Sequence, residues 1–108
     1  MTEGDFQAKA IKYLESRGAY VVNQWGTPVS GSGVPDLLVC YHGRFVALEC
    51  KHPEAAIPNG LTVVHDRFAE PAQRMHLARI RKAGGEAFVI NGMPQLELML
   101  DWIDHDEI

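Results

Sequence analysis

The sequence predicts a single α/β domain over residues 1–108, in which helices pack on a mixed β-sheet. A chain of 108 residues is long enough for one domain with a real core and too short for two. Apolar residues make up 46% of the chain and charged residues 22%, as in ordinary soluble domains. The apolar spacing changes between helical and strand periods along the chain. It gives the element order αβββαβα, which is typical of helices covering a mixed sheet.

The N-terminal segment is predicted to be a helix over residues 3–17. Thr2 followed by Asp5 has the pattern of a capping box, and Gly18 ends the helical periodicity. The next elements are expected to be a strand at 19–24, a loop rich in Gly and Ser at 25–33, and strands at 35–41 and 44–51.

The C-terminal half is predicted to contain two helices around one strand. The first of these helices ends at Gly84-Gly85, where glycine interrupts the pattern. The expected elements are a loop at 52–67, a helix at 69–83, a strand at 86–91 and a final helix at 94–104.

Three charged residues interrupt the two most apolar strands, and their spacing predicts a metal site. A two-residue turn at His42-Gly43 is plausible, since glycine tolerates positive φ and histidine is enriched there. That turn places Asp36 opposite Glu49, with Cβ atoms about 4.5–5.5 Å apart, and Lys51 on the same face. Facing carboxylates repel each other unless a cation lies between them, and Mg²⁺ typically takes one or two protein carboxylates. Lys51 beside such an ion could orient or deprotonate a metal-bound water.

Both faces of this predicted hairpin are expected to be buried, because apolar residues occupy both. The charged face also carries Leu38, Cys40, Phe45 and Ala47. Cys40 and Cys50 fall on opposite faces, which excludes a disulfide between them. The sequence has no clustered Cys and His spacing that would indicate zinc.

Polar residues also lie on the apolar stripes of two predicted helices. At about 100° per residue, Glu3 and Gln7 fall within the apolar arc of the first helix, and Gln73 within that of the second. Glu3 could instead be a first-turn acid favoured by the helix dipole. Together with the hairpin residues, the three predict one shared polar site.

The charge distribution indicates a local basic surface on a chain of net charge −4. Four acids lie in the last eight residues, so the first 100 residues are neutral overall. Residues 67–82 contain one acid, Glu70, and five basic residues: Arg67, Arg74, Arg79, Arg81 and Lys82. This surface is compatible with a nucleic-acid partner or with a solvated helix face.

No apolar run approaches the ~20 residues of a membrane span, and the N-terminus lacks a signal-peptide pattern. We therefore expect a cytoplasmic protein with no membrane partner.

The motifs together resemble a known nuclease family. "PD" at 35–36 and "ECK" at 49–51 are similar to the signature of the PD-(D/E)xK nucleases, whose restriction-endonuclease-like core has the order αβββαβ. With Glu3, Gln7 and "DRFAEPAQ" at 66–73, the chain resembles the virus-type replication-repair nuclease (VRR-NUC) domain over roughly 3–91. It is also similar to Holliday junction resolvases, and its size is that of stand-alone bacterial and phage members.

The resemblance implies a site that uses Mg²⁺ or Mn²⁺. Its implied metal ligands are Asp36, Glu49, Glu3 and the main-chain carbonyl of Cys50, and its implied catalytic residues are Asp36, Glu49, Lys51, Glu3 and Gln73. The residues assigned to DNA binding are Arg74, Arg81, Lys82 and Gln7. Glu15 is the alternative first-helix acid, and Ser30 or Ser32 could match a loop serine that assists in resolvases.

The resulting hypothesis is a metal-dependent endonuclease that cuts Holliday junctions or related branched DNA. The alternatives are a non-catalytic DNA-binding or assembly module and a sequence-specific restriction-type nuclease. We also predict a homodimer, because a four-way junction needs two nicks and the chain shows one triad. Leu98 and Trp102 project beside the apolar stripe of the last helix and are the expected interface.

Overall fold

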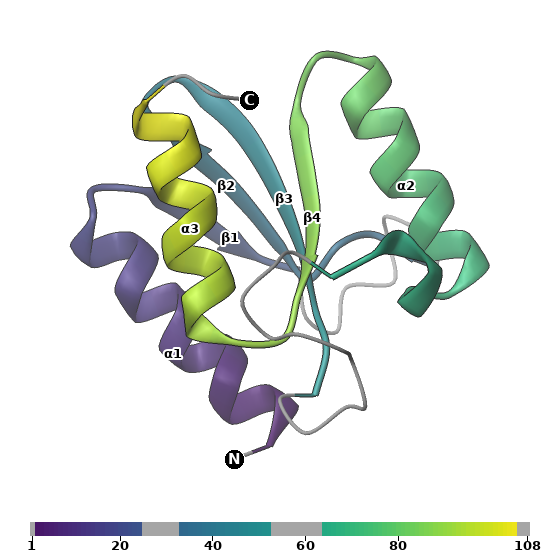
Figure 1. Ribbon diagram of the computed structural model, residues 1–108, viewed down its shortest axis with the longest axis horizontal. Coiled ribbons are helices and arrows are strands. Elements are labelled where there is room, and N and C mark those ends of the chain that lie inside the picture. Colours follow the sequence, from purple (N-terminus) through teal and green to yellow (C-terminus); the bar gives the residue numbers. More distant parts are fainter. Residues whose placement is uncertain (1, 25–32, 53–63, 106–108) are drawn as a thin grey trace.

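The fold is that of a four-stranded mixed sheet covered by three α-helices, as the computed structural model shows for residues 2–24, 33–52 and 64–105 (Figure 1). The elements are α1 (Glu3–Ser16), β1 (Tyr20–Asn23), β2 (Leu37–Tyr41), β3 (Arg44–Cys50), the 3₁₀ helix η2 (Asp66–Phe68), α2 (Pro71–Lys82), β4 (Glu86–Ile90) and α3 (Met93–Asp104). The predicted αβββαβ order with a C-terminal helix is confirmed.

The strands follow one another across the sheet in the order β1-β2-β3-β4. β1 and β2 are antiparallel, as are β2 and β3, whereas β3 and β4 run parallel. His42 has φ 50° and Gly43 φ 79°, the positive values that a tight two-residue hairpin turn requires. Leu37 consequently faces Leu48, as predicted, and the next pair in this register is Asp36 with Glu49.

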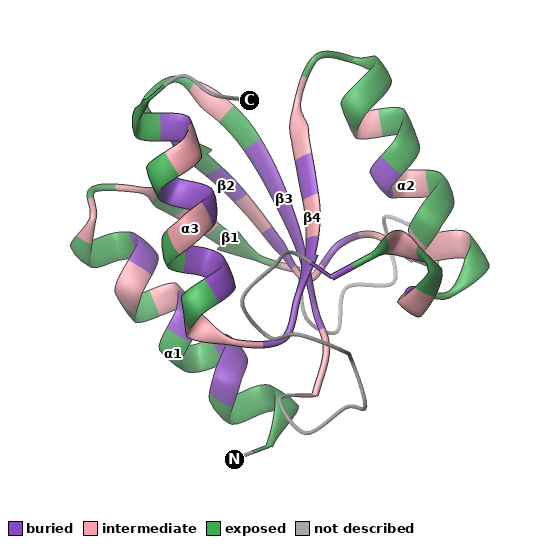
Figure 2. Cartoon of the chain, in the orientation of Figure 1, coloured by how far each residue is buried: buried purple, intermediate pink, exposed green. Residues whose placement is uncertain are grey.

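The helices cover the sheet from both sides. α1 and α3 lie on one face, and α2 lies on the other (Figure 1). The larger core, between α1, α3 and the sheet, gathers apolar side chains that include Phe6, Leu14, Leu37, Tyr41, Leu48, Leu96 and Leu100. A smaller core under α2 contains Ala47, Val64, Ala69, Leu77, Ala87 and Val89. Figure 2 shows that buried residues are concentrated along β3 and toward the C-terminal end of β4.

The expectation that both faces of the hairpin are buried is wrong for one face. Cys40 is exposed and Phe45 is 47% exposed. Tyr20, which faces Cys40 across β1 and β2, is 71% exposed. The reason is that α2 packs on β3 and β4, so the β1–β2 side of this face has no helix over it among the described residues.

The expected exposure of Leu98 and Trp102 on the last helix is also wrong, since both side chains are half-buried. The Trp102 ring lies 6.3 Å from that of Phe88, centroid to centroid, so it covers the α3 face of β4. The apolar face of α3 is therefore wider than its central stripe and is used within the domain.

The helix boundaries follow local chemistry. Thr2 and Asp5 form the predicted capping box, because each side chain accepts a hydrogen bond of 3.0 Å from the other's backbone N–H. The second helix begins at Pro71 rather than residue 69, since proline suits the first helical position. η2 and an isolated bridge from Val64 to Val89 occupy part of the predicted loop.

No helix in the described parts of the chain has both the length and the apolar character to cross a bilayer.

Candidate active site

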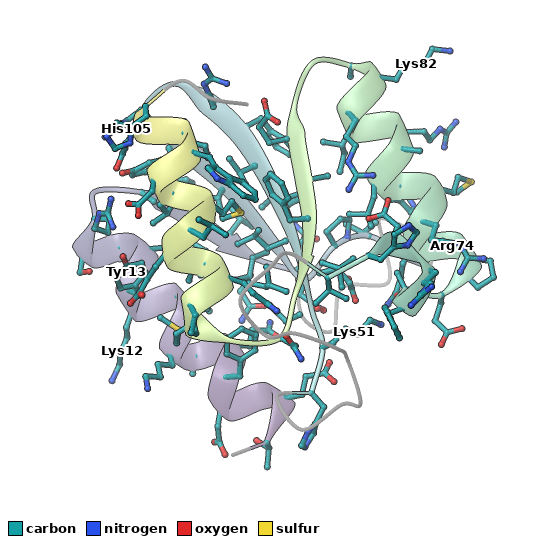
Figure 3. The ribbon with its side chains drawn as sticks, viewed as in Figure 1. Lys12, Tyr13, Lys51, Arg74, Lys82 and His105 are labelled. Carbon is teal, nitrogen blue, oxygen red and sulfur yellow. The ribbon has the colours of Figure 1, made fainter. Side chains whose placement is uncertain are left out.

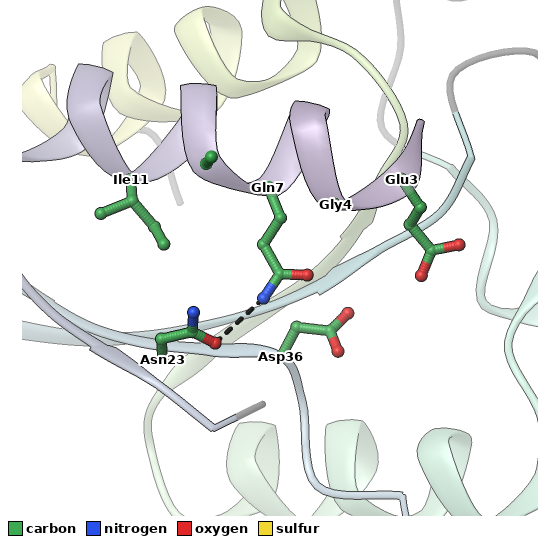
Figure 4. Close-up of a pocket in the computed structure, with 7 residues that line it drawn as sticks. Glu3, Gly4, Gln7, Ile11, Asn23 and Asp36 are labelled. Atoms are coloured by element: carbon green, nitrogen blue, oxygen red, sulfur yellow. Dashed lines mark hydrogen bonds between the residues drawn. The ribbon is translucent and has the colours of Figure 1, made fainter. Parts of the chain in front are cut away.

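The polar residues singled out from the sequence gather at one end of the sheet. β2 begins there and β3 ends there, so Asp36 and Glu49 are adjacent in the hairpin register. The N-terminal turn of α1 brings Glu3 to the same end, beside Asp36 (Figure 4). The N-terminal turn of α2 brings Gln73 there, where it bonds to Glu49. Four separate elements therefore meet around one pair of carboxylates.

Asp36 and Glu49 form a coupled pair in a largely dehydrated position. Glu49 is 3% exposed, and Oδ2 of Asp36 accepts a hydrogen bond of 2.8 Å from the backbone N–H of Cys50. Burial, together with the neighbouring Asp36 carboxylate, raises the pKa of Glu49 to about 8. Burial also raises the pKa of Asp36. The pair therefore holds a proton at neutral pH unless a cation compensates its charge.

The surroundings of Glu49 fit a divalent cation. Its Oε2 accepts a hydrogen bond from Gln73, but its buried Oε1 has no hydrogen-bond partner within the described structure. A buried carboxylate oxygen without a partner is costly, and Mg²⁺ and Mn²⁺ bind oxygen ligands of this kind. Glu49, Asp36 and the carbonyl of Cys50 are the groups that would hold the ion. When bound, it would polarise a phosphate and lower the pKa of a water molecule.

The ion would rely on few protein ligands. In residues 2–24, 33–52 and 64–105, no three His, Cys, Asp or Glu side chains come close enough to form a metal cluster, so Glu3 does not join Asp36 and Glu49 as the third carboxylate ligand that was expected. Two carboxylates completed by water and substrate oxygens is the arrangement that Mg²⁺ commonly adopts. Burial raises the pKa of the Cys50 thiol, so this side chain stays protonated and does not serve as a thiolate ligand.

Gln73 links three parts of the site through one amide. Its Nε2 donates to Glu49 Oε2 at 2.7 Å, while its Oε1 accepts from Lys51 Nζ at 2.9 Å and from the backbone N–H of Glu70 at 2.7 Å. Because a lysine ammonium and a backbone N–H can only donate, these partners fix which end of the amide faces which group.

Lys51 is held at the edge of the carboxylate pair. Its Nζ lies 3.8 Å from Glu49 Oε2, and its backbone N–H donates to Ile90 O of β4 at 2.8 Å. The backbone of Lys51 is therefore fixed to β4 and its ammonium to Gln73, while the side chain remains half-buried rather than enclosed. An ammonium in this position can donate to a water or a phosphate oxygen placed beside Glu49.

A pocket of about 520 Å³ opens between α1 and the edge of the sheet beside Asp36. Glu3 and Gln7 line it together with Asp36 (Figure 4). Gln7 Nε2 donates to Asn23 Oδ1 at 3.0 Å. Glu15, the alternative acid of α1, is exposed and does not line this pocket. Ser30 and Ser32 lie outside the described residues.

The basic side chains of α2 are exposed, but they differ in what they contact. Arg74 donates to Ala69 O at 2.7 Å and lies toward the end of α2 nearer Lys51, whereas Lys82 lies at the far end (Figure 3). The guanidinium of Arg81 pairs with Asp66 and donates to Ala87 O, so part of its charge is compensated within the domain.

Asn23 is the site residue that sequence reasoning missed. It ends β1 and carries no periodicity signal of its own, so only the pairing of β1 with β2 brings it opposite Leu37 and next to Gln7. The direct signal was Gln7 itself, a polar residue on an apolar stripe that implied a polar partner.

This chain resembles known proteins when its three-dimensional structure is compared with solved structures. The sequence matches no protein-family model and no curated protein. A solved structure described as "VRR_NUC domain" has 28% sequence identity and a TM-score of 0.61, covering 97% of this chain and 98% of its own. The chain therefore has the fold of a VRR_NUC domain.

A second VRR_NUC structure supports the fold alone. It is described as "VRR_NUC domain protein", has 18% identity and a TM-score of 0.65, and covers 94% of this chain and 86% of its own. The VRR_NUC likeness agrees with the PD-(D/E)xK-type arrangement seen here, in which Asp36 directly precedes β2, Glu49 lies near the end of β3 and Lys51 directly follows β3. The roles of individual residues rest on the geometry described above.

Proposed function

We propose that this VRR_NUC-type domain is a metal-dependent endonuclease that hydrolyses phosphodiester bonds in branched DNA, Holliday junctions included. The observation that carries the proposal is the buried Glu49, whose Oε1 lacks a partner beside the Asp36 carboxylate. Such a pair repels a phosphodiester when it is charged, so it is useful to a nuclease only together with Mg²⁺ or Mn²⁺.

The residues around the carboxylate pair have different proposed roles in catalysis. Asp36 and Glu49 hold the ion, with the Cys50 carbonyl as a further ligand, and Glu3 is the first-helix acid of the adjoining pocket. Lys51 positions the attacking water, and Gln73 acts as a positioning residue because it orients both Lys51 and Glu49. A domain that only binds DNA would gain nothing from a dehydrated carboxylate pair, which supports catalysis over a pure assembly role.

A substrate panel tests the activity. Purified protein with Mg²⁺ or Mn²⁺ is incubated with a four-way junction, a flap, a fork and linear duplex, and the products are resolved on sequencing gels. Cleavage of branched DNA that disappears in EDTA and in Glu49→Gln supports the proposal. Binding without cleavage of any of the four substrates would instead indicate the non-catalytic module, and cleavage of linear duplex at one sequence a restriction-type enzyme.

The basic surface of α2 is the proposed DNA contact. Arg74, Arg81 and Lys82 are exposed on the helix whose N-terminal turn carries Gln73, so a strand that reaches the carboxylate pair can continue along α2. Phosphate contacts from such residues supply affinity and orientation without reading sequence. We place this DNA-cutting role in the cytoplasm of a bacterium or of a phage-infected host.

We also propose that the domain works as a homodimer. One chain carries one Asp36–Glu49–Lys51 set, whereas resolution of a two-fold symmetric junction requires two cuts. The exposed row formed by Tyr20, Cys40 and Phe45 supports a self-association surface, because contiguous exposed apolar residues mark interfaces.

Light scattering at micromolar concentration tests the dimer. We expect a dimeric wild type and a monomeric Phe45→Glu variant with an unchanged melting temperature. Leu98→Glu on α3 is the comparison, since its half-buried position predicts destabilisation rather than dissociation. A monomeric wild type that cuts both junction strands in one binding event would rule the dimer out.

A further inference from the structure

The pocket beside Asp36 is larger than a metal site requires. Its volume is about 520 Å³, within the usual 300–1,000 Å³ range of small-molecule sites. The helix α1, the end of β1 and the start of β2 form its walls. Because Asp36 belongs both to this pocket and to the carboxylate pair, a nucleotide whose phosphate reaches the pair can place its own base or sugar at the pocket.

The polar groups of the pocket are held in fixed orientations. Gln7 is only 7% exposed, and its amide donates to Asn23 Oδ1 at 3.0 Å. Figure 4 shows this amide pair between Ile11 on one side and the Glu3 and Asp36 carboxylates on the other. Primary amides offer both donors and acceptors, which is the combination that pairs with the edge of a nucleobase.

The charges of the pocket disfavour a phosphate and permit a neutral base. Its ionisable lining residues are Glu3 and Asp36, both acidic, and none of its lining residues is basic. Ile11, Ala8 and the main chain at Gly4 supply an apolar wall against which a planar ring can lie. A pair of hydrogen-bonded amides, an apolar wall and acidic charge together fit a heterocycle better than a backbone segment.

We propose that this pocket receives the unstacked nucleobase of the nucleotide next to the scissile phosphate. This inference rests on the proposed nuclease function and specifies how that site would select its substrate. Extrusion of a base from an intact duplex costs several kcal/mol, whereas an unpaired base at a branch point is already free. The pocket thus favours cleavage next to unpaired nucleotides, independently of contacts that α2 makes with the backbone.

The test uses branched substrates that differ at one nucleotide. A flap or junction is prepared with each of the four bases, or with an abasic tetrahydrofuran residue, next to the mapped cleavage position. We expect the abasic substrate to lower the single-turnover kcat/KM of the wild type by about tenfold, the size of one lost pair of base contacts. The effect should appear at that nucleotide and vanish when the abasic residue is moved several positions away.

Asn23→Ala and Gln7→Ala should lower cleavage of the base-containing substrates to the level of the abasic substrate, which removes the difference between the two. Asn23 is exposed, so its replacement leaves the core intact, whereas Gln7→Ala is accompanied by a thermal melt to verify folding. Lys12→Ala, exposed on the side of α1 away from the pocket, is the control and should retain the full abasic penalty.

The possible failures are distinguishable. If the wild type cuts none of the substrates with Mg²⁺ or Mn²⁺, the proposed function fails. If it cuts base-containing and abasic substrates equally well, the nuclease stands and the base pocket is wrong. If Asn23→Ala lowers Mn²⁺ affinity in calorimetry and keeps the abasic penalty, the pocket serves the metal and the inference is overturned.

Discussion

Replacement of Glu49 by glutamine should stabilise the metal-free domain, and the gain should grow with pH. Glutamine has the shape of a protonated glutamate, so its carbonyl can keep the bond from Gln73 while its amide faces Asp36 in place of a repelling oxygen. The folded protein holds a proton on the Asp36–Glu49 pair that the unfolded chain releases above pH 4.5. Stability from this group is therefore present below pH 4.5 and is lost as the pH rises to about 8.

The size of the effect follows from the pKa of Glu49. A rise from 4.5 to about 8 corresponds to about 5 kcal/mol if the whole difference belongs to Glu49. Because Asp36 shares the proton, we assign about half of it, or about 2.5 kcal/mol, to this one substitution. For a domain of this size that is a melting temperature higher by about 10–20 °C at pH 8.5.

The assay is thermal and urea unfolding of wild type and Glu49→Gln in EDTA at pH 5 and pH 8.5. We expect the stability difference between the two proteins to be about 2 kcal/mol or more larger at pH 8.5 than at pH 5. Glu97→Gln, at an exposed position of α3, is the matched control and should show no pH-dependent difference. Added Mn²⁺ should stabilise the wild type more than the variant, since a ligand stabilises the state that binds it.

An equal difference at both pH values would refute this reasoning. So would a variant that is less stable than the wild type at pH 8.5.

Three further results are expected. Lys51→Ala should lower the single-turnover cleavage rate by at least about 100-fold and retain DNA affinity, because it removes a group that positions water but no metal ligand. A near-normal cleavage rate would contradict the role of Lys51 in positioning water. Replacement of Arg74 and Arg81 by alanine should reduce the slope of log affinity against log salt by about one to two, because Asp66 compensates part of the charge of Arg81. An unchanged slope would exclude α2 from the interface. Gly33→Ala should destabilise by more than about 2 kcal/mol, because its φ is 86° and a Cβ would lie 2.5 Å from backbone of α2. Gly18 has φ 88° and no atom within 4 Å of an added Cβ, so Gly18→Ala measures the destabilisation that comes from the backbone conformation alone. Equal losses of unfolding free energy in the two variants would show that the contact with α2 is unimportant.

The local chemistry of the sequence was sufficient to predict the hairpin and the carboxylate pair. His42-Gly43 determines the turn, and the turn determines the register that sets Asp36 opposite Glu49. The capping box at Thr2 likewise depends only on neighbouring residues. Features of this kind can be predicted because each is decided within a few residues along the chain.

The features that could not be predicted depend on packing between distant segments. Periodicity assigned Phe45 to a buried face, but whether a face is covered depends on where α2 lies on the sheet. The exposure expected for Trp102 is wrong for the same reason, since its contact with Phe88 depends on how α3 packs on β4. Asn23 joined the pocket only through the β1–β2 register, which no turn signal fixed.

Gln73 couples the first turn of α2 to Lys51, so the stability of that turn depends on the state of the site. The same oxygen that holds Lys51 also accepts the backbone N–H of Glu70, so the first turn of the helix cannot fray without releasing the lysine. Hydrogen exchange at the Glu70 amide consequently measures how often the site comes apart on its own. A ligand that draws Lys51 away from Gln73 should change that exchange rate even though it never touches the amide. The hydrogen-exchange rate of the Glu70 amide should therefore report substrate binding without the need for cleavage.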